Sequence, residues 1–297
     1  MDRLDAMSVL LAAVEAGSLS AASRRLGMPL ATVSRKVAEL EEHLKARLLI
    51  RAPRQFALTD AGRSYVAACK TILEQVGEAE KAAAGEYANP RGDLTITAPV
   101  AFGRLHLLPV VADFLQVYPE IDVRLSFSDR FVQLLEEHVD LALRIGDLPD
   151  STLRASRLGT IRQVTCASPA YLAQHGTPCI PADLSGYDCI NLEIIHTNDR
   201  WMFGAEAVAI QPRLRVNTAE AAVDAACLGL GITRVLSYQA AQSLADGRLM
   251  RLLTDHEPPP RPVSLVYAAQ GLLPLKLRAF LDFATPRLKA RLAGETP

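Results

Sequence analysis

The chain has 297 residues, which is enough for two or three domains that each bury a hydrophobic core. Hydrophobic residues make up 49 % of it and aromatic residues 5 %, and no apolar run approaches the roughly eighteen residues that cross a membrane. The formal net charge of -1 excludes a uniformly basic nucleic-acid-binding chain, so any contact with nucleic acid must be confined to one region.

The first 17 residues predict a helix and not a signal peptide. Leu4, Met7, Leu11 and Val14 recur at helical spacing, and the apolar run is short and has acidic residues within it. We therefore expect a cytoplasmic protein. The 5 cysteines agree with this location, because they are scattered and lack a C-x-x-C pair, which predicts reduced thiols and no zinc site.

Residues 18–44 predict two short helices joined by a tight turn. The Ser20 hydroxyl can cap the first helix, Gly27 breaks it, and Pro29 suits the opening turn of the second. In the second helix, apolar residues recur at helical spacing and share one buried side: Val33, Val37, Leu40 and Leu44. The entrance and outer side of this helix are left with Leu30, Ala31, Thr32, Ser34, Arg35 and Lys36.

Positive charge is concentrated around these helices. From Ser18 to Phe56 there are eight basic residues and three acidic ones, a balance of plus five in a nearly neutral chain. Neutralisation of nucleic-acid phosphates requires such a local excess. A buried stripe, a cationic outer side and a short helix across a glycine turn predict a helix-turn-helix. An ordinary amphipathic hairpin with solvated Arg and Lys side chains has the same spacing and charge.

The next segments predict a β-hairpin and a long helix. Residues 48–58 are basic and interrupted by Pro53, which predicts a wing with Arg51 and Arg54 near its tip, in reach of phosphate unless the turn is merely solvated. Thr59 can cap a proline-free helix that would be on the order of 43 Å long. A heptad seam on this helix predicts dimerisation, although the helix could pack on its own chain. The seam consists of Tyr65, Cys69, Ile72, Val76, Ala79 and Ala83.

From Asn89 onward the pattern is that of an α/β domain. The run Asn89-Pro90-Arg91-Gly92 breaks the long helix. The alternation after it is βαβαβ, which predicts a mostly parallel sheet. Its elements are strand 94–97, helix 104–117, strand 121–127, helix 130–138 and strand 139–145. A second set follows, with strand 214–216, helix 219–228 and strand 232–236, before strand 263–268 and helix 274–292 return to the first sheet.

Two α/β lobes of this kind predict a ligand site between them. Open α/β sheets bind ligands beyond the carboxyl ends of their strands, where helix N-termini present N–H groups. The first-lobe candidates are Thr97, Ala98, Pro99, Val100, Phe102, Ser128, Arg144, Ile145 and Gly146. The second-lobe candidates are Thr165, Cys166, Asn217, Thr218 and Gly229. Individually, Ser128 and Thr218 could be helix caps, Arg144 a surface charge and the glycines turn residues.

Known catalytic motifs are missing from the sequence. It has no H-E-x-x-H, G-x-S-x-G or Walker A motif, and Gly229-Leu230-Gly231 is followed by Arg234 where a dinucleotide fingerprint needs its third glycine. The 6 histidines have no metal-ligand spacing. We therefore expect no enzyme, cofactor or metal site. The competing interpretations are an α/β enzyme and a two-lobed solute-binding protein, but the second would need a signal peptide and would not use basic N-terminal helices.

Three N-terminal motifs, SLSAASRRLG, ATVSRKVAELEEHLKARLLIR and FALTDAG, resemble the DNA-binding domain of the LysR-type transcriptional regulators. The rest of the chain is similar to the effector domain of that family. The recognition helix departs from the family, whose members often begin it with Ser-Gln-Pro-Ala, because this chain has Pro29, Leu30, Ala31 and Thr32. Leu30 replaces the Gln that often reads a base edge, and it could contact a thymine methyl instead.

The resemblance implies an architecture and a function. It implies an all-α winged helix-turn-helix in residues 1–59, a dimerisation linker helix in 60–88 and a periplasmic-binding-protein-like α/β effector domain in 92–297. Lobe I would comprise 92–162 and 264–297, and lobe II 163–263. Such a homodimer or homotetramer regulates transcription by binding an inverted repeat in double-stranded DNA, under the control of a small organic acid or aromatic inducer. The expected DNA contacts are Ser20, the residues named above at the entrance and outer side of the recognition helix, Arg51 and Arg54.

Overall fold

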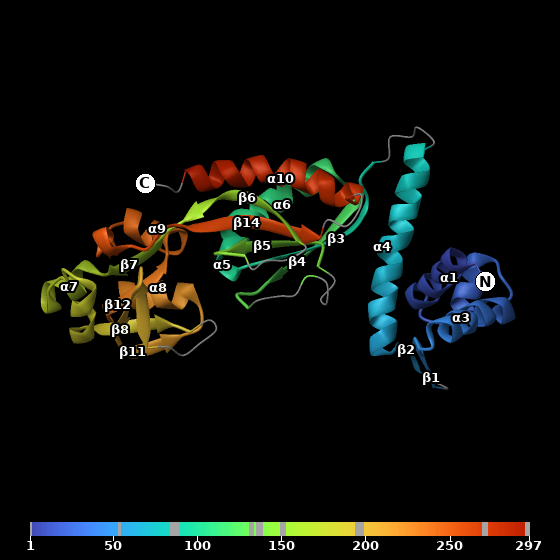
Figure 1. Ribbon diagram of the computed structural model, residues 1–297, viewed down its shortest axis with the longest axis horizontal. Coiled ribbons are helices and arrows are strands. Elements are labelled where there is room, and N and C mark those ends of the chain that lie inside the picture. The colour runs from blue at the N-terminus through green and yellow to red at the C-terminus, as the bar shows by residue number, and fades with distance from the viewer. Residues whose placement is uncertain are drawn as a thin grey trace. The chain divides into compact units, whose positions relative to one another are not determined.

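The computed structural model describes residues 2–52, 55–83, 89–130, 134, 139–148, 153–193, 199–268 and 273–294. The chain divides into two compact units, residues 1–89 and residues 90–297. Each unit has its own hydrophobic core, and each is described by itself below (Figure 1).

The first unit is a helix-turn-helix with a two-stranded wing and a long helix. The predicted stripe on the second helix of the motif is confirmed, because Val33, Val37 and Leu40 are fully buried and pack against Leu10. The wing strands pair antiparallel, which confirms the predicted hairpin. The elements are α1 (Arg3–Glu15), α2 (Leu19–Leu26), α3 (Leu30–Leu44), β1 (Leu49–Ala52), β2 (Gln55–Leu58) and α4 (Asp60–Ala83).

The caps of two helices differ from the prediction. Ser18, and not Ser20, caps α2, since its Oγ accepts the backbone N–H three positions on at 3.1 Å. Leu19 packs against the core and starts the helix, which leaves Ser20 inside it. Pro29 is the residue before the first turn of α3 and not within that turn. Gly27 ends α2 with a φ of 64°, a conformation that favours glycine.

Helix α4 is fixed to its own unit along its first half. Thr59 Oγ1 accepts the Gly62 backbone N–H at 2.9 Å, which confirms Thr59 as the cap. Val66 packs into the core of the unit, and Cys69 is fully buried. Helix α1 contacts α4 directly.

The second unit begins with lobe I, whose five-stranded sheet has the order β4-β3-β5-β14-β6. β3 pairs parallel with β4 and β5, but β14 pairs antiparallel with β5 and β6. The three strands of the predicted βαβαβ run are parallel, as expected, and the sheet is mixed because β14, the strand that returns from lobe II, runs in the opposite direction. Most of the predicted helix 130–138 lies outside the described residues. The strands are β3 (Gly92–Ala98), β4 (Ile121–Phe127), β5 (Leu141–Ile145), β6 (Leu153–Ile161) and β14 (Arg261–Ala268).

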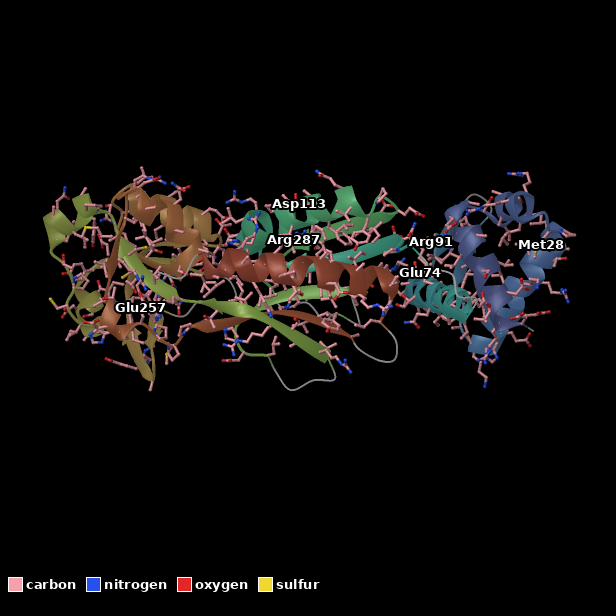
Figure 2. All side chains as sticks on the ribbon, turned by 90° about the horizontal axis from the view of Figure 1, so that it is seen from above. Met28, Glu74, Arg91, Asp113, Glu257 and Arg287 are labelled. Atoms are coloured by element: carbon pink, nitrogen blue, oxygen red, sulfur yellow. The ribbon has the colours of Figure 1, made fainter. Side chains whose placement is uncertain are left out.

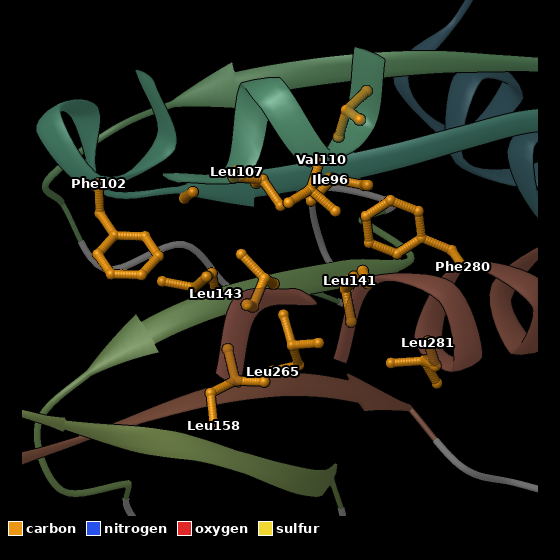
Figure 3. Packing of buried hydrophobic residues seen from close by; sticks show 14 of the residues in the cluster. Ile96, Phe102, Leu107, Val110, Leu141, Leu143, Leu158, Leu265, Phe280 and Leu281 are labelled. Carbon is orange, nitrogen blue, oxygen red and sulfur yellow. The ribbon is translucent and has the colours of Figure 1, made fainter. Parts of the chain in front are cut away.

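Helices α6 (Leu108–Val117) and α10 (Leu275–Ala293) lie side by side on one face of this sheet (Figure 1). Figure 3 shows Ile96 and Leu141 of the sheet near the ring of Phe280 of α10. α6 continues a helical stretch that starts with α5 (Val100–Phe102) and the π-helix η1 (Gly103–Leu107). Residues 100–117 are long and apolar enough to cross a membrane by length and composition, but the stretch packs into the lobe I core, as core helices of soluble domains do.

Lobe II has a second five-stranded sheet, with the order β11-β8-β12-β7-β13. Helix α8 covers one face of it, while α7, η2 and the hairpin β9–β10 carry the apolar residues that cover the other. The strands are β7 (Gln163–Ala167), β8 (Asp188–Leu192), β9 (Arg200–Phe203), β10 (Glu206–Ala209), β11 (Gln211–Val216), β12 (Ile232–Leu236) and β13 (Met250–Leu252). The helices are α7 (Pro169–His175), η2 (Pro181–Gly186), α8 (Ala219–Cys227), α9 (Ser237–Ala245) and η3 (Thr254–His256).

The chain crosses between the lobes twice, between β6 and β7 and between β13 and β14. An aromatic cluster adds a third link. Tyr238 of α9 is buried in the lobe I core, where its ring centroid lies 5.4 Å from that of Phe102 and 5.5 Å from that of His106. Lobe II is therefore packed directly against the α5–η1 segment of lobe I.

Candidate functional site

The entrance of α3 presents an apolar and a cationic side chain to solvent. Leu30 is 45 % exposed, Ala31 is exposed, and the Arg35 side chain is 68 % exposed. Thr32 and Ser34 are half-buried beside them. No side chain caps this helix. The free N–H groups of its first turn can therefore donate to an external acceptor such as a phosphate.

Ion pairs hold other basic side chains of the helix-turn-helix. Lys36 Nζ pairs with the Asp5 carboxylate of α1, so Lys36 is tied to its own domain. Arg35 lies 3.6 Å from Glu39 on the same helix and remains mostly exposed. Since Asp5 is 31 residues away, the spacing within α3 gave no sign that Lys36 is paired.

Glu41 fixes the wing to α3, and the sequence analysis missed it. Its buried carboxylate accepts the backbone N–H groups of Leu48 at 2.8 Å and Leu49 at 3.1 Å, and it lies 3.3 Å from Arg47 Nη1. Hydrogen bonds to a carboxylate are stronger than neutral ones. The start of β1 is thereby held against the end of α3.

The remaining predicted DNA contacts have different placements. Ser20 is exposed on α2. Arg51 belongs to β1, but its side chain lies outside what the structure describes. Arg54 is not among the described residues.

The predicted seam on α4 is accessible only in part. Cys69 is fully buried within this chain and cannot face a partner chain, contrary to the prediction. Ile72 is 38 % exposed, Val76 is half-buried and Ala79 is exposed. Tyr65 is half-buried and packs against the core of the unit, and the Ala83 side chain lies outside what the structure describes.

The residues after β3 fall into two groups. Ala98 and Phe102 are fully buried in the lobe I core, so they do not line a cleft as predicted. Thr97 points to the opposite face because side chains alternate along a strand. Its hydroxyl is buried and has no hydrogen-bond partner among the described residues. Pro99 and Val100 are half-buried at the start of α5.

The other lobe I candidates have local roles. Ser128 Oγ accepts the Arg130 backbone N–H at 3.2 Å, as a turn residue does. Arg144 is half-buried on β5, and Ile145 packs on the core. Gly146 ends the strand with a φ of 107°, which favours glycine.

Asp129 is a further residue that the sequence analysis missed. Its carboxylate accepts the Val100 backbone N–H at 3.1 Å, and burial raises its pKa. Glu220, on the first turn of α8 in lobe II, also raises this pKa and lies 3.8 Å from Arg104 of lobe I. Charged groups of both lobes thus meet near the start of α5.

The lobe II candidates also comprise residues buried in the sheet and residues at the ends of a helix. Cys166 is fully buried among apolar residues under α8, and burial raises its pKa to about 12, so it is not a lining residue. Thr165 is buried and faces the opposite side of the sheet. Thr218 caps α8, Asn217 is exposed just before it, and Gly229 follows the helix with a φ of 80°.

Arg234 is the most unusual buried group in lobe II, and the sequence analysis did not select it as a ligand residue. It is 6 % exposed, and its guanidinium carbon lies 4.1 Å from the centre of the Phe203 ring. Its Nε and Nη2 atoms are buried without a hydrogen-bond partner among the described residues. Burial, together with the nearby charge of Arg261, lowers its pKa to about 10.

Family models match both units of the chain. Residues 4–63 match the bacterial regulatory helix-turn-helix protein, lysR family, and residues 88–289 match the LysR substrate binding domain. The relatives are regulators and not enzymes or transport proteins, which decides against the two competing interpretations. Within the described part of the chain no group of three or more His, Cys, Asp or Glu side chains could hold a metal ion.

Individual relatives extend over almost the whole chain. The probable regulator LtrA of Klebsiella pneumoniae is 33 % identical over 100 % of this chain and 98 % of its own length. The activator AaeR of Escherichia coli is 32 % identical over 96 % of this chain and 94 % of its own. The solved structure of CrgA, a LysR-type regulator from Neisseria meningitidis, is 33 % identical, covers 96 % of this chain and 98 % of its own, and gives a TM-score of 0.61. This chain belongs to the LysR-type transcriptional regulators and acts as a DNA-binding, effector-controlled regulator of transcription.

Proposed function

We propose that α3 lies in the major groove and reads base edges with its entrance residues. The observation that supports this most directly is the exposed side formed by Leu30, Ala31 and Arg35 at a helix start without a side-chain cap. Leu30 would contact a thymine methyl, and Thr32 and Ser34 would reach neighbouring bases. Phosphate contacts would come from Arg35, Arg51 and Arg54, together with Ser20 of α2. Lys36 would contribute less, because its ammonium group pairs with Asp5.

The regulated assembly would be a cytoplasmic homodimer or homotetramer on an inverted repeat. Residues 1–59 would bind DNA, 60–88 would join two chains, and the lobes of 92–297 would hold a small organic acid or aromatic effector between them. The effector must bind one arrangement of the lobes more tightly than another, because a ligand with equal affinity for both shifts nothing. Closure of the two lobes around the effector would change the spacing of the two DNA-binding domains.

Binding of the full chain to its own promoter region tests the DNA-binding proposal. Fluorescence anisotropy should show tight binding. The logarithm of the association constant should fall linearly with the logarithm of the salt concentration. Leu30→Ala should weaken binding to that promoter and leave binding to unrelated duplex unchanged. Equal loss on both duplexes would contradict base contact by Leu30.

Sedimentation of α4 variants tests the proposed dimer contact. Ile72→Asp places a charge on the predicted seam and should shift the chain toward monomer. Thr71→Asp, at the exposed neighbouring position outside the seam, is the matched control. If both variants sediment as the unmodified chain does, the seam does not join two copies.

A further inference from the structure

The guanidinium group of Arg234 lies on the face of the lobe II sheet that is opposite α8. Ile232, two residues earlier on β12, packs in the cluster that includes Trp201 and Phe203 of the β9–β10 hairpin. Val235 packs in the other cluster, with residues of α8. Because side chains alternate along a strand, Arg234 shares the face of Ile232, and its position over the Phe203 ring agrees.

Arg234 is the middle residue of β12, two residues before the carboxyl end, and α/β sheets bind ligands beyond that end of their strands. Polar groups lie beside it. Thr165 is directly opposite it on β7 and is also buried. On the neighbouring strand β8, the Asn191 amide oxygen accepts the Trp201 indole N–H at 3.1 Å. A buried cation is thus placed in a polar part of an otherwise apolar interior.

The nearby carboxylate is already engaged by other arginines. Glu257, labelled in Figure 2, accepts two hydrogen bonds from Arg251, both at 2.8 Å, and lies 4.0 Å from Arg162. Arg261, whose charge helps to lower the pKa of Arg234, adds a further positive charge. Glu257 thus pairs with two arginines, while Arg234 and Arg261 add two more positive charges nearby, and this local charge favours an additional anion.

The atoms of Arg234 that lack a partner define the shape of that anion. Nε and Nη2 carry their N–H groups along one edge of the planar guanidinium, and both are buried without a partner among the described residues. Two parallel N–H groups on one edge match the two oxygens of a carboxylate. Leaving such a buried charged donor unsatisfied is strongly unfavourable. No described protein group supplies the acceptor.

We propose that Arg234, in the middle of β12 in lobe II, binds the carboxylate of the effector through its Nε–Nη2 edge. The proposal rests on the effector-binding function and specifies its ligand as a small carboxylate. It places the recognition of charge in lobe II, on the sheet face that also carries Thr165. Both nitrogen atoms are covered, so the ligand must displace neighbouring groups when it enters.

The simplest alternative is that Arg234 stabilises the fold through its contact with Phe203. Stability separates the two roles without any ligand. If Arg234 serves binding, its buried charge destabilises the fold in the absence of ligand. Arg234→Met should then unfold at the same temperature as the unmodified chain or at a higher one. A structural cation should behave in the opposite way, and a clearly lower unfolding temperature for Arg234→Met would overturn the proposal.

Thermal unfolding of the full chain with acetate, benzoate and succinate tests the ligand class. At least one of these carboxylates should raise the unfolding temperature, whereas acetamide and benzamide should not. Arg234→Met and Arg234→Lys should lower the affinity about tenfold or more, since Lys retains the charge and lacks the planar edge. Arg213→Met is the matched control, because Arg213 is an exposed arginine of lobe II that pairs with Asp188 at 2.8 Å.

Three outcomes of the ligand experiment would also overturn the proposal. In the first, a carboxylate raises the unfolding temperature of Arg234→Met as much as that of the unmodified chain. In the second, none of the carboxylates raises the unfolding temperature of the unmodified chain. In the third, inorganic phosphate raises it as much as the carboxylates do. The measurement contains no DNA, so its failure is distinguishable from failure of the regulatory function. A chain that binds its promoter and ignores every carboxylate would lose this assignment alone.

Discussion

Two adjacent cations of α3, Arg35 and Lys36, have different surroundings in the structure, and we expect different effects on DNA binding. Arg35→Ala should weaken binding to every duplex and reduce the salt slope by about one, the change that follows loss of one phosphate contact. Lys36→Met should change DNA affinity less, because its ammonium group pairs with Asp5. It should instead lower the free energy of unfolding by up to about 1 kcal/mol, since the pair is partly exposed. Anisotropy at several salt concentrations and urea unfolding measure both effects, and an equal fall in salt slope for the two variants would refute the distinction.

His106 should make the stability of the effector domain depend on pH. Burial, with a contribution from Arg291, lowers its pKa from 6.5 to about 4. Between these values His106 binds more protons in the unfolded chain than in the folded chain, so its contribution to the free energy of unfolding falls as pH decreases from 6.5 to 4 and does not change further below that. The loss is on the order of 3 kcal/mol. Urea unfolding across this range should show the loss in the unmodified chain and in His175→Gln, an exposed histidine control. If His106→Phe retains the same loss, another group is responsible.

Among the elements, the wing depends on one carboxylate of the preceding helix. Glu41→Ala would leave the buried N–H groups of Leu48 and Leu49 without this acceptor, so the free energy of unfolding should fall by about 1–3 kcal/mol. DNA affinity should fall as well, because the wing loses its fixed position beside α3. Glu42→Ala, one position further along the same helix and exposed, should change neither quantity. Urea unfolding and anisotropy would show this, and unchanged stability in Glu41→Ala would contradict the proposed role.

Periodicity is a property of neighbouring residues, and it predicted the elements that neighbouring residues determine. The helical spacing in α3, the alternation in β4 and the hairpin around Pro53 each follow from local sequence. Asp5, Glu41 and Arg234 owe their roles to partners that are distant in the chain or belong to another strand, so no local pattern identified them. Cys166 shows the converse, because it lies on a strand that was predicted to line the ligand site and yet faces the apolar side of its sheet.

For the molecule as a whole, the division into units with separate cores explains how sensing and DNA binding can coexist in one chain. The family resemblance, and not composition, predicted that both units belong to one regulator. The sequence did not predict that Tyr238 of lobe II enters the core of lobe I, because that contact depends on how the two lobes pack. A ligand that alters lobe packing would therefore act on the lobe I core as well.

Separate cores also predict what happens when the units are disconnected. A chain of residues 1–88 keeps the core formed by α1, α2, α3 and the first half of α4, so it should fold and bind promoter DNA with the same salt slope as the full chain. It should not respond to any effector, since both lobes are missing. Anisotropy with and without a carboxylate that changes DNA binding by the full chain measures this. A response that survives in residues 1–88 would remove the lobes from the regulatory mechanism, whereas loss of DNA binding together with loss of helical circular dichroism would show that unit 1 needs the lobes to fold.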